Sequence, residues 1–227
     1  MLRICGFAKW ARVLLCALTV GIASAPIGYA ATETDEATAQ QTEQTPVAIA
    51  GFRSATFGMD KPAVIAAIAK DFGVDEADIV QGQNTVERTD LLTVQVPDLL
   101  EGGGTAQVSY IFGYTSKALI QVGASWNATI DPAMTDKQLV ANSDVLSSHF
   151  LAGDYAAGSL TTATAVANGI LLFRGLDTEG HSAILLLQGN FEENTDGLKA
   201  LKPTGLALLY SVNPDTPDIF RIKDGNF

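Results

Sequence analysis

The sequence predicts an α+β protein with two tandem modules, each a helix followed by an antiparallel meander of three or more strands. Two observations lead to this fold class. A helix-start pattern at residues 58–62, Gly-Met-Asp-Lys-Pro, recurs in related form at residues 134–138, Met-Thr-Asp-Lys-Gln. After each helix come three strand-like runs separated by polar or glycine-rich turns. The domains expected from this pattern are a first module at residues 47–130 and a second at residues 131–227.

The N-terminus has the organisation of a secretory signal peptide at residues 1–30. An apolar run follows three basic residues, Arg3, Lys9 and Arg12. Small residues ending at Ala30 come after this run. This run is shorter than the roughly 20 apolar residues that a membrane-spanning helix needs. We therefore expect cleavage after Ala30, a periplasmic or secreted mature protein, and no stable membrane insertion after cleavage.

Both cysteines, Cys5 and Cys16, lie in the predicted signal peptide, so the mature chain would have no thiol for a disulfide or a metal. A lipoprotein start at Cys16 is the competing interpretation. It is disfavoured because Leu15 stands where such a motif needs a small residue. Residues 31–46 contain no large apolar side chain, and we expect them to form a disordered leader.

The charge of the chain argues against polyanionic partners. It has 25 acidic and 14 basic residues and a formal net charge of −11, and such a surface repels nucleic acid and anionic lipid.

Motifs for phosphate and calcium binding are incomplete. The glycines at 102–104 lack the following lysine of a phosphate-binding loop and lead into a strand. The acidic runs at 75–78 and 193–197 lack the ligand spacing of an EF-hand. We expect no nucleic-acid partner, no cofactor and no metal site.

The first predicted helix starts at Asp60, a good N-cap residue, and tolerates Pro62 in its first turn. Val64 and Ile68 lie on its apolar face, and Gly73 is expected to end it.

In the second predicted helix, Thr135 and Gln138 have the spacing of a capping box, in which each side chain accepts from the other residue's backbone N–H. Its apolar face consists of Leu139, Leu146 and Phe150, and it should stop near Gly153.

Three strands are expected after each helix, at residues 91–96, 107–112 and 118–126, and then at 169–173, 182–187 and 206–212. The strands of the first set alternate polar and apolar residues, which is typical of a sheet that is packed on one face and solvated on the other. The runs at 170–173 and 184–187 are apolar on both faces. Their second face therefore needs a cover, from either the first module or a partner.

Part of the sequence resembles known proteins. The segment Phe-Arg-Ser-Ala-Thr-Phe-Gly-Met at 52–59, followed by Val64, and the segment Val-Ser-Tyr-Ile-Phe-Gly at 108–113, with Leu119, carry the resemblance. They resemble a group of exported bacterial proteins of uncharacterised function. More distantly, they are similar to the helix-plus-meander modules of small outer-membrane assembly lipoproteins and of β-lactamase inhibitor protein, which has two modules in tandem.

This resemblance implies a binding or assembly role and supplies no residue-level site. The chain departs from the lipoproteins because it has no lipobox, and from the inhibitor because it has no cysteine framework. The first difference argues against membrane tethering.

Candidate catalytic residues are few. His149 and His181 are the chain's two histidines and its candidate neutral-pH bases. We expect His149 at the surface or at a helix end and His181 in a solvated turn. The sequence around His181 fails the nucleophile-elbow pattern because Ile184 stands at the last glycine position. Paired carboxylates of the glycosidase kind cannot be selected from sequence, because their separation depends on the fold.

We therefore expect an exported, non-enzymatic module that binds another envelope protein or acts in envelope assembly. The expected contact residues lie on the polar strand face of the first module: Thr93, Gln95, Gln121 and Ser125. The alternative is a secreted hydrolase whose acidic active site forms only in the fold. A deep pocket with converging titratable groups would favour the enzyme, whereas a broad and shallow surface would favour the binding module.

Overall fold

The structure is a computed structural model that describes residues 46–193, 197–222 and 225. These residues belong to one compact unit, Thr42–Phe227. The expected signal peptide and leader lie outside the described residues, apart from Pro46, whose backbone forms a parallel bridge with Asp154. Cleavage after Ala30 stays a prediction.

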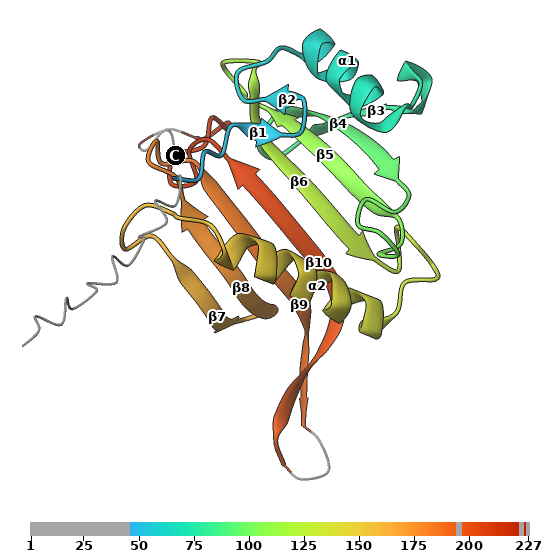
Figure 1. Ribbon diagram of the computed structural model, residues 1–227. Coiled ribbons are helices and arrows are strands. Elements are labelled where there is room, and N and C mark those ends of the chain that lie inside the picture. The colour runs from blue at the N-terminus through green and yellow to red at the C-terminus, as the bar shows by residue number, and fades with distance from the viewer. Residues whose placement is uncertain (1–45, 194–196, 223–224, 226–227) are drawn as a thin grey trace, which may run out of the picture. The chain divides into compact units, whose positions relative to one another are not determined.

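Eight antiparallel strands form the main sheet in the order β3-β4-β5-β6-β10-β9-β8-β7 (Figure 1). The strands are β3 Val80–Asn84, β4 Thr89–Val96, β5 Ala106–Phe112, β6 Leu119–Asn127, β7 Thr161–Val166, β8 Gly169–Leu176, β9 Ser182–Glu193 and β10 Lys199–Ser211. A small separate sheet pairs β1 (Gly51–Phe52) with β2 (Ala55–Thr56). The predicted α+β class is confirmed, and the six predicted strands correspond to β4, β5, β6, β8, β9 and β10.

The sequence did not reveal the two outer strands of this sheet. β3 has the sequence Val-Gln-Gly-Gln-Asn and β7 the sequence Thr-Thr-Ala-Thr-Ala-Val, and both are largely exposed. An edge strand with two exposed faces needs no apolar alternation, so the sequence pattern of a buried strand is missing from both.

The two meanders form one sheet because β6 pairs with β10 in antiparallel register, from Asn127 opposite Gly205 to Gln121 opposite Ser211. The strands of residues 47–130 therefore extend the sheet sideways. They do not lie over the apolar second face of β8 and β9. The expectation that the first module covers this face is therefore wrong.

Helix α1 spans Lys61–Phe72 and has the predicted ends. The Asp60 carboxylate accepts a hydrogen bond of 2.9 Å from the backbone N–H of Ala63. Gly73 adopts a left-handed conformation with a φ of 65°, which glycine tolerates without a steric penalty. A short 3₁₀ helix, Glu76–Asp78, leads from α1 into β3.

Helix α2 spans Asp136–Leu151 and ends two residues before Gly153. Both hydrogen bonds of the predicted capping box are present. The Gln138 N–H donates to Thr135 Oγ1 at 3.2 Å, and the Thr135 N–H donates to Gln138 Oε1 at 3.1 Å.

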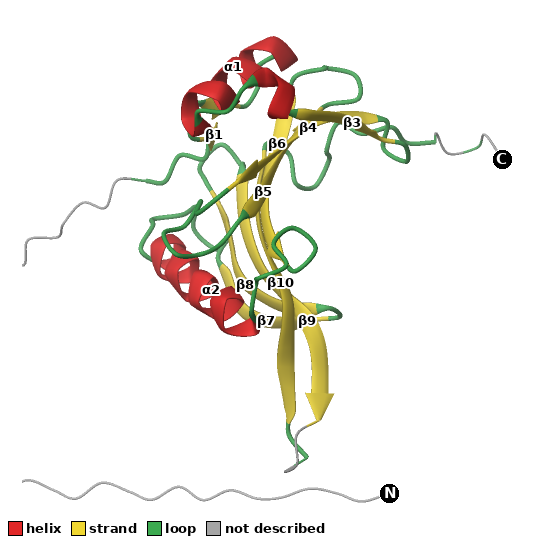
Figure 2. Cartoon of the chain, turned by 90° about the vertical axis from the view of Figure 1, so that its right-hand side faces the viewer, coloured by secondary structure: helices red, strands yellow, loops and turns green. Residues whose placement is uncertain are grey.

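Both helices lie on the same face of the sheet (Figure 2), where one hydrophobic core extends through the described residues. Val64 and Ile68 of α1, and Leu139, Leu146 and Phe150 of α2, belong to this core. Phe150 stacks on Phe173 of β8 with ring centroids 5.2 Å apart. In the described part of the chain, neither helix is long and apolar enough to cross a membrane.

Candidate interaction surface

The sheet has a second face, opposite the helices, which we call the open face. Residues that pair directly across antiparallel strands project to the same side of a sheet, so the register identifies the members of this face. One row across the sheet is Val80, Thr93, Ser109, Gly123, Leu209, Ile184, Arg174 and Thr161. The next row is Gln95, Gln107, Ser125, Ala207, Leu186, Leu171 and Thr164.

All four residues that the sequence singled out lie on the open face. Thr93 belongs to the first of these rows, and Gln95 and Ser125 belong to the second. Gln121 lies two residues before Gly123 on β6, so it projects to the same side, where it pairs with Ile111 and Ser211. Gln95 is exposed and the other three are half-buried. The structure therefore places these side chains on one surface, and their role in binding a partner stays a prediction.

The open face becomes apolar where it crosses the second half of the chain. Leu209 pairs with Ile184, and Leu186 pairs with both Ala207 and Leu171. These side chains are half-buried, whereas the alternate residues of the same strands pack in the core below α2. The sequence contained the signal, since these strands are apolar on both faces, but the predicted contact residues did not include them.

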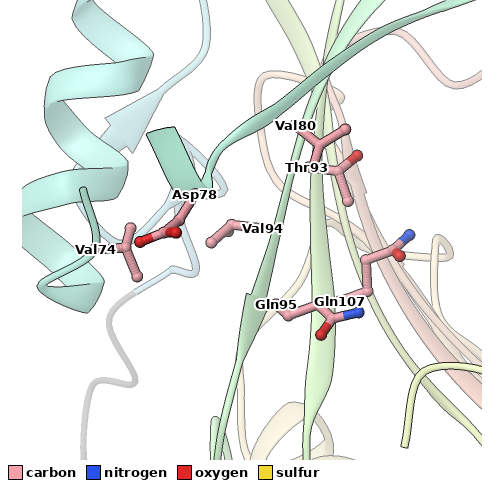
Figure 3. A pocket seen from close by; sticks show the side chains of 7 residues that line it. All are labelled: Val74, Asp78, Val80, Thr93, Val94, Gln95 and Gln107. Carbon is pink, nitrogen blue, oxygen red and sulfur yellow. The ribbon is translucent and has the colours of Figure 1, made fainter. Parts of the chain in front are cut away.

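The outer edge of the first meander is hollowed next to two of the predicted residues (Figure 3). A cavity of about 640 Å³ there is lined by Val74, Asp78, Val80, Thr93, Val94, Gln95 and Gln107. It lies where β3 begins: Val80 pairs with Thr93, while β4 continues to Val96. Residues 94–96 of β4 therefore have no strand partner on their outer side among the described residues.

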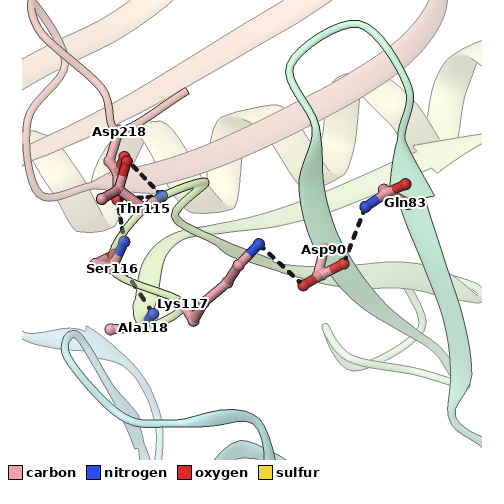
Figure 4. A network of polar contacts seen from close by, with 7 residues as sticks. All are labelled: Gln83, Asp90, Thr115, Ser116, Lys117, Ala118 and Asp218. Carbon is pink, nitrogen blue, oxygen red and sulfur yellow. Dashed lines mark hydrogen bonds and ion pairs between the residues drawn. The ribbon is translucent and has the colours of Figure 1, made fainter. Parts of the chain in front are cut away.

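The chain that follows β10 is fastened to one end of the sheet (Figure 4). The Asp218 carboxylate accepts hydrogen bonds from the backbone N–H groups of Ser116, at 2.8 Å, and Thr115, at 3.1 Å. These bonds, that from Ser116 first, hold the pKa of Asp218 below its usual value. In the same turn, Lys117 Nζ lies 3.6 Å from an Asp90 oxygen. The arrangement stabilises a turn.

The two histidines occupy different environments. His149 is exposed near the end of α2, as expected, with its ring edge-on to Phe150 at a centroid distance of 5.2 Å. The expectation of a solvated His181 is corrected: its side chain is only 18% exposed, and its Nδ1 lies 3.2 Å from Asp177 Oδ2. Its ring also packs edge-on against Phe57.

Asp177 is a buried carboxylate that organises the turn between β8 and β9. It accepts hydrogen bonds of 2.9 Å from the backbone N–H groups of Ile49, Glu179 and His181. Burial by itself raises the pKa of this carboxyl. The three backbone hydrogen bonds and the charge interaction with His181 together outweigh burial, so the net shift is downward. The Ile49 bond fastens the N-terminal part of the described chain to this turn, which indicates a structural role.

The described residues contain no group of three or more histidine, cysteine, aspartate or glutamate side chains that could hold a metal ion. Of the two acidic runs considered for calcium, residues 75–78 lead into and form the 3₁₀ helix. Residues 193–197 fall partly outside the described chain.

Comparisons with known proteins add no relative. No protein-family model matches the chain, no curated protein matches it, and no solved structure matches it.

Proposed function

We propose that this chain is an exported, non-enzymatic module that binds a protein of the cell envelope, or acts in envelope assembly, through the open face of its sheet. One observation carries the proposal: in the described chain the helices pack on one face of the sheet. The other face runs from polar side chains such as Thr93, Gln95 and Ser125 to half-buried apolar ones on β9 and β10, with Leu171 and Arg174 of β8 beyond them. A broad surface of this kind suits a macromolecule better than a small substrate.

The distribution of side chains on the open face supports protein binding. Protein interfaces commonly have an apolar centre and a polar rim. Here Ile184, Leu186 and Leu209 form the apolar part, with Thr93 and its polar neighbours on one side and the threonines of β7 on the other. Eight strands about 4.8 Å apart span roughly 34 Å, and a seven-residue strand is about 24 Å long. The resulting area, about 800 Å², is comparable with one side of a standard protein interface.

Export and internal duplication belong to the same proposal. The signal-peptide pattern at residues 1–30 supports a periplasmic or secreted location, and hence a partner in the envelope. The order of elements supports two tandem modules, since α1 is followed by β3 to β6 and α2 by β7 to β10. The expected resemblance to proteins with tandem helix-plus-meander modules points in the same direction.

The alternative, a secreted hydrolase with an acidic site, gains no support from these cavities. The edge cavity is lined by one carboxylate, Asp78, and a small cavity of about 50 Å³ near the end of β10 by another, Asp218. Acid hydrolysis of the glycosidase kind needs two carboxylates facing one substrate. Among the described residues, neither of these two cavities is lined by such a pair.

The proposal is tested by placing two arginines on the open face, with Gln95→Arg and Gln121→Arg combined. Wild-type protein should capture a reproducible partner from an envelope extract, and the double variant should bind that partner at least about tenfold more weakly, because two large cations would clash and lose hydration. The measurement is a titration of the captured partner against each protein.

The matched control combines Gln81→Arg and Gln83→Arg. Both glutamines are exposed on β3 and pair with Leu92 and Asp90, so they belong to the opposite side of the sheet. This control changes the net charge by the same amount and should leave binding unchanged. Equal binding by both double variants, with unchanged circular dichroism and melting, would exclude the open face as the binding surface. The absence of any reproducible partner would overturn the proposed function.

A further inference from the structure

Two adjoining cavities lie on the helix side of the sheet, where the β1–β2 turn faces the last turns of α2. Their volumes are about 430 Å³ and 330 Å³, and together we call them the helix-side cleft. Phe52, Arg53, His149, Phe150 and Tyr210 line both of them. Each volume is in the range, roughly 300 to 1,000 Å³, of sites that enclose small molecules.

The walls of the cleft are apolar and its charged lining is basic. The cavity of about 330 Å³ is lined by Leu146, Trp126 and Leu208, and the cavity of about 430 Å³ by Val47, Ile49 and Tyr155. Among the described residues, no aspartate or glutamate lines either cavity. In a chain with 25 acidic residues and a net charge of −11, this is a local reversal of the overall charge.

Arg53 supplies the permanent positive charge at this site. It is exposed in the turn between β1 and β2, where its φ is 53°, a left-handed conformation that is uncommon for a residue with a side chain. Its guanidinium lies 4.8 Å from the Phe72 ring centroid, and Nη1 donates to the backbone carbonyl of Asp71 at 3.2 Å.

The guanidinium retains donors for a ligand. The Asp71 carboxylate accepts from the backbone N–H of Ser54 at 2.8 Å, and Arg53 is in none of the ion pairs of the described residues. A guanidinium has five N–H donors, of which one is used by the bond to Asp71.

Two further residues of the lining, Trp126 and Tyr210, carry hydrogen-bond donor groups. Trp126 is buried, and its indole N–H has no hydrogen-bond partner among the described residues, a costly arrangement unless water or a ligand accepts from it. The Tyr210 hydroxyl, which is protonated at neutral pH, can also donate, and burial raises its pKa further, to about 12. The lining therefore combines apolar walls with donors and a cation.

We propose that the helix-side cleft binds an apolar molecule with a single carboxylate, of the size of a medium-chain fatty acid. Its carboxylate lies at Arg53 and His149, and its apolar chain lies along Phe150 and Trp126. The charge of the lining selects an anion, and the absence of lining carboxylates removes the repulsion that the rest of the chain would exert. This inference concerns the face opposite the proposed protein-binding surface and is independent of it.

The test is calorimetric titration of the full chain with dodecanoate, and with dodecyltrimethylammonium as a ligand of the same chain length and opposite charge. Dodecanoate should bind saturably and the cation at least about tenfold more weakly. In Arg53→Gln the Kd for dodecanoate should rise at least about tenfold, because the carboxylate loses its cation. The matched control is Arg88→Gln: Arg88 also has a positive φ, 54°, and lies 3.7 Å over a phenylalanine ring, that of Phe220, outside the cleft.

A second pair of variants keeps the proposal testable if Arg53→Gln unfolds. Val145 lines the cavity of about 330 Å³ and is 60% exposed, whereas Val140 is 40% exposed on the same helix and lines neither cavity. Val145→Glu should weaken dodecanoate binding by like-charge repulsion, and Val140→Glu should not. The proposal is overturned if dodecanoate shows no saturable binding, if both ligands bind equally, or if the cleft variants bind as their controls do.

Discussion

At the scale of single residues, Asp177 shows how a buried carboxylate can hold two distant segments together. Its three backbone N–H donors come from Ile49 and from the turn that Asp177 itself begins. Since its pKa is lowered in the folded state, its contribution to stability is full above the ordinary aspartate pKa of about 3.9 and is lost as the pH falls through the folded value.

We therefore expect Asp177→Asn to lower the free energy of unfolding by about 2 kcal/mol at pH 7, the usual scale for hydrogen bonds to a charged group. The difference from wild type should begin to shrink below about pH 3.9, where the carboxyl of the unfolded chain becomes protonated, and it should disappear as the pH falls through the lower pKa of the folded state. Urea denaturation between pH 7 and pH 3 measures it. Asp215→Asn is the control, because Asp215 is 86% exposed and lies 3.9 Å from Arg174, so its effect should be small at either pH. A difference that does not change with pH would contradict this account.

At the scale of elements, the helix ends are determined by short-range chemistry. The capping box of α2 satisfies the N–H of Gln138 through Thr135, and both partners lie within four residues of sequence. Such signals are readable before folding because they need no tertiary contact.

Thr135→Ala should therefore lower the free energy of unfolding by about 1 kcal/mol, because it leaves the N–H of Gln138 without its side-chain acceptor. For a chain of this size, that corresponds to a fall in melting temperature of about 2 to 4 °C. Thermal unfolding followed by circular dichroism measures the change. Thr129→Ala, at an exposed loop position, is the matched control and should melt as wild type does. Equal melting of the two variants would show that the cap contributes nothing.

At the scale of the whole described unit, one core and one sheet connect both halves of the chain. Core residues from α1, α2 and all the central strands belong to a single cluster. Strand β6 pairs with β10 at seven residue positions. The two helix-plus-meander segments should therefore unfold together, even if they arose by duplication.

Phe173→Ala tests this coupling. Phe173 is fully buried, stacks on Phe150 and contacts Tyr155 with ring centroids 4.9 Å apart, so its truncation should cost about 3 to 5 kcal/mol. Hydrogen exchange should show the same loss of protection for the amides of β5 as for those of β9, because both exchange through global unfolding. If β9 lost protection while β5 kept it, the two halves would be independent folding units.

By itself the sequence determined the fold class, both helices with their caps, and the six strands that have a buried face. These features follow from local hydrogen bonding and from periodicity over a few residues. It also placed Thr93, Gln95, Gln121 and Ser125 on one strand face, because side chains alternate along a strand. The register of the sheet agrees with that alternation.

Only the tertiary structure decided what depends on contacts between distant segments. Strands β3 and β7 are identified by their pairing with β4 and β8, because the sequence of an exposed edge strand has no apolar alternation. The pairing of β6 with β10 left the apolar face of β8 and β9 open. His181 became half-buried because Asp177 and Phe57 meet it in space. Arg53 and His149 line one cleft because a turn and a helix end converge, and no local pattern encodes such a convergence.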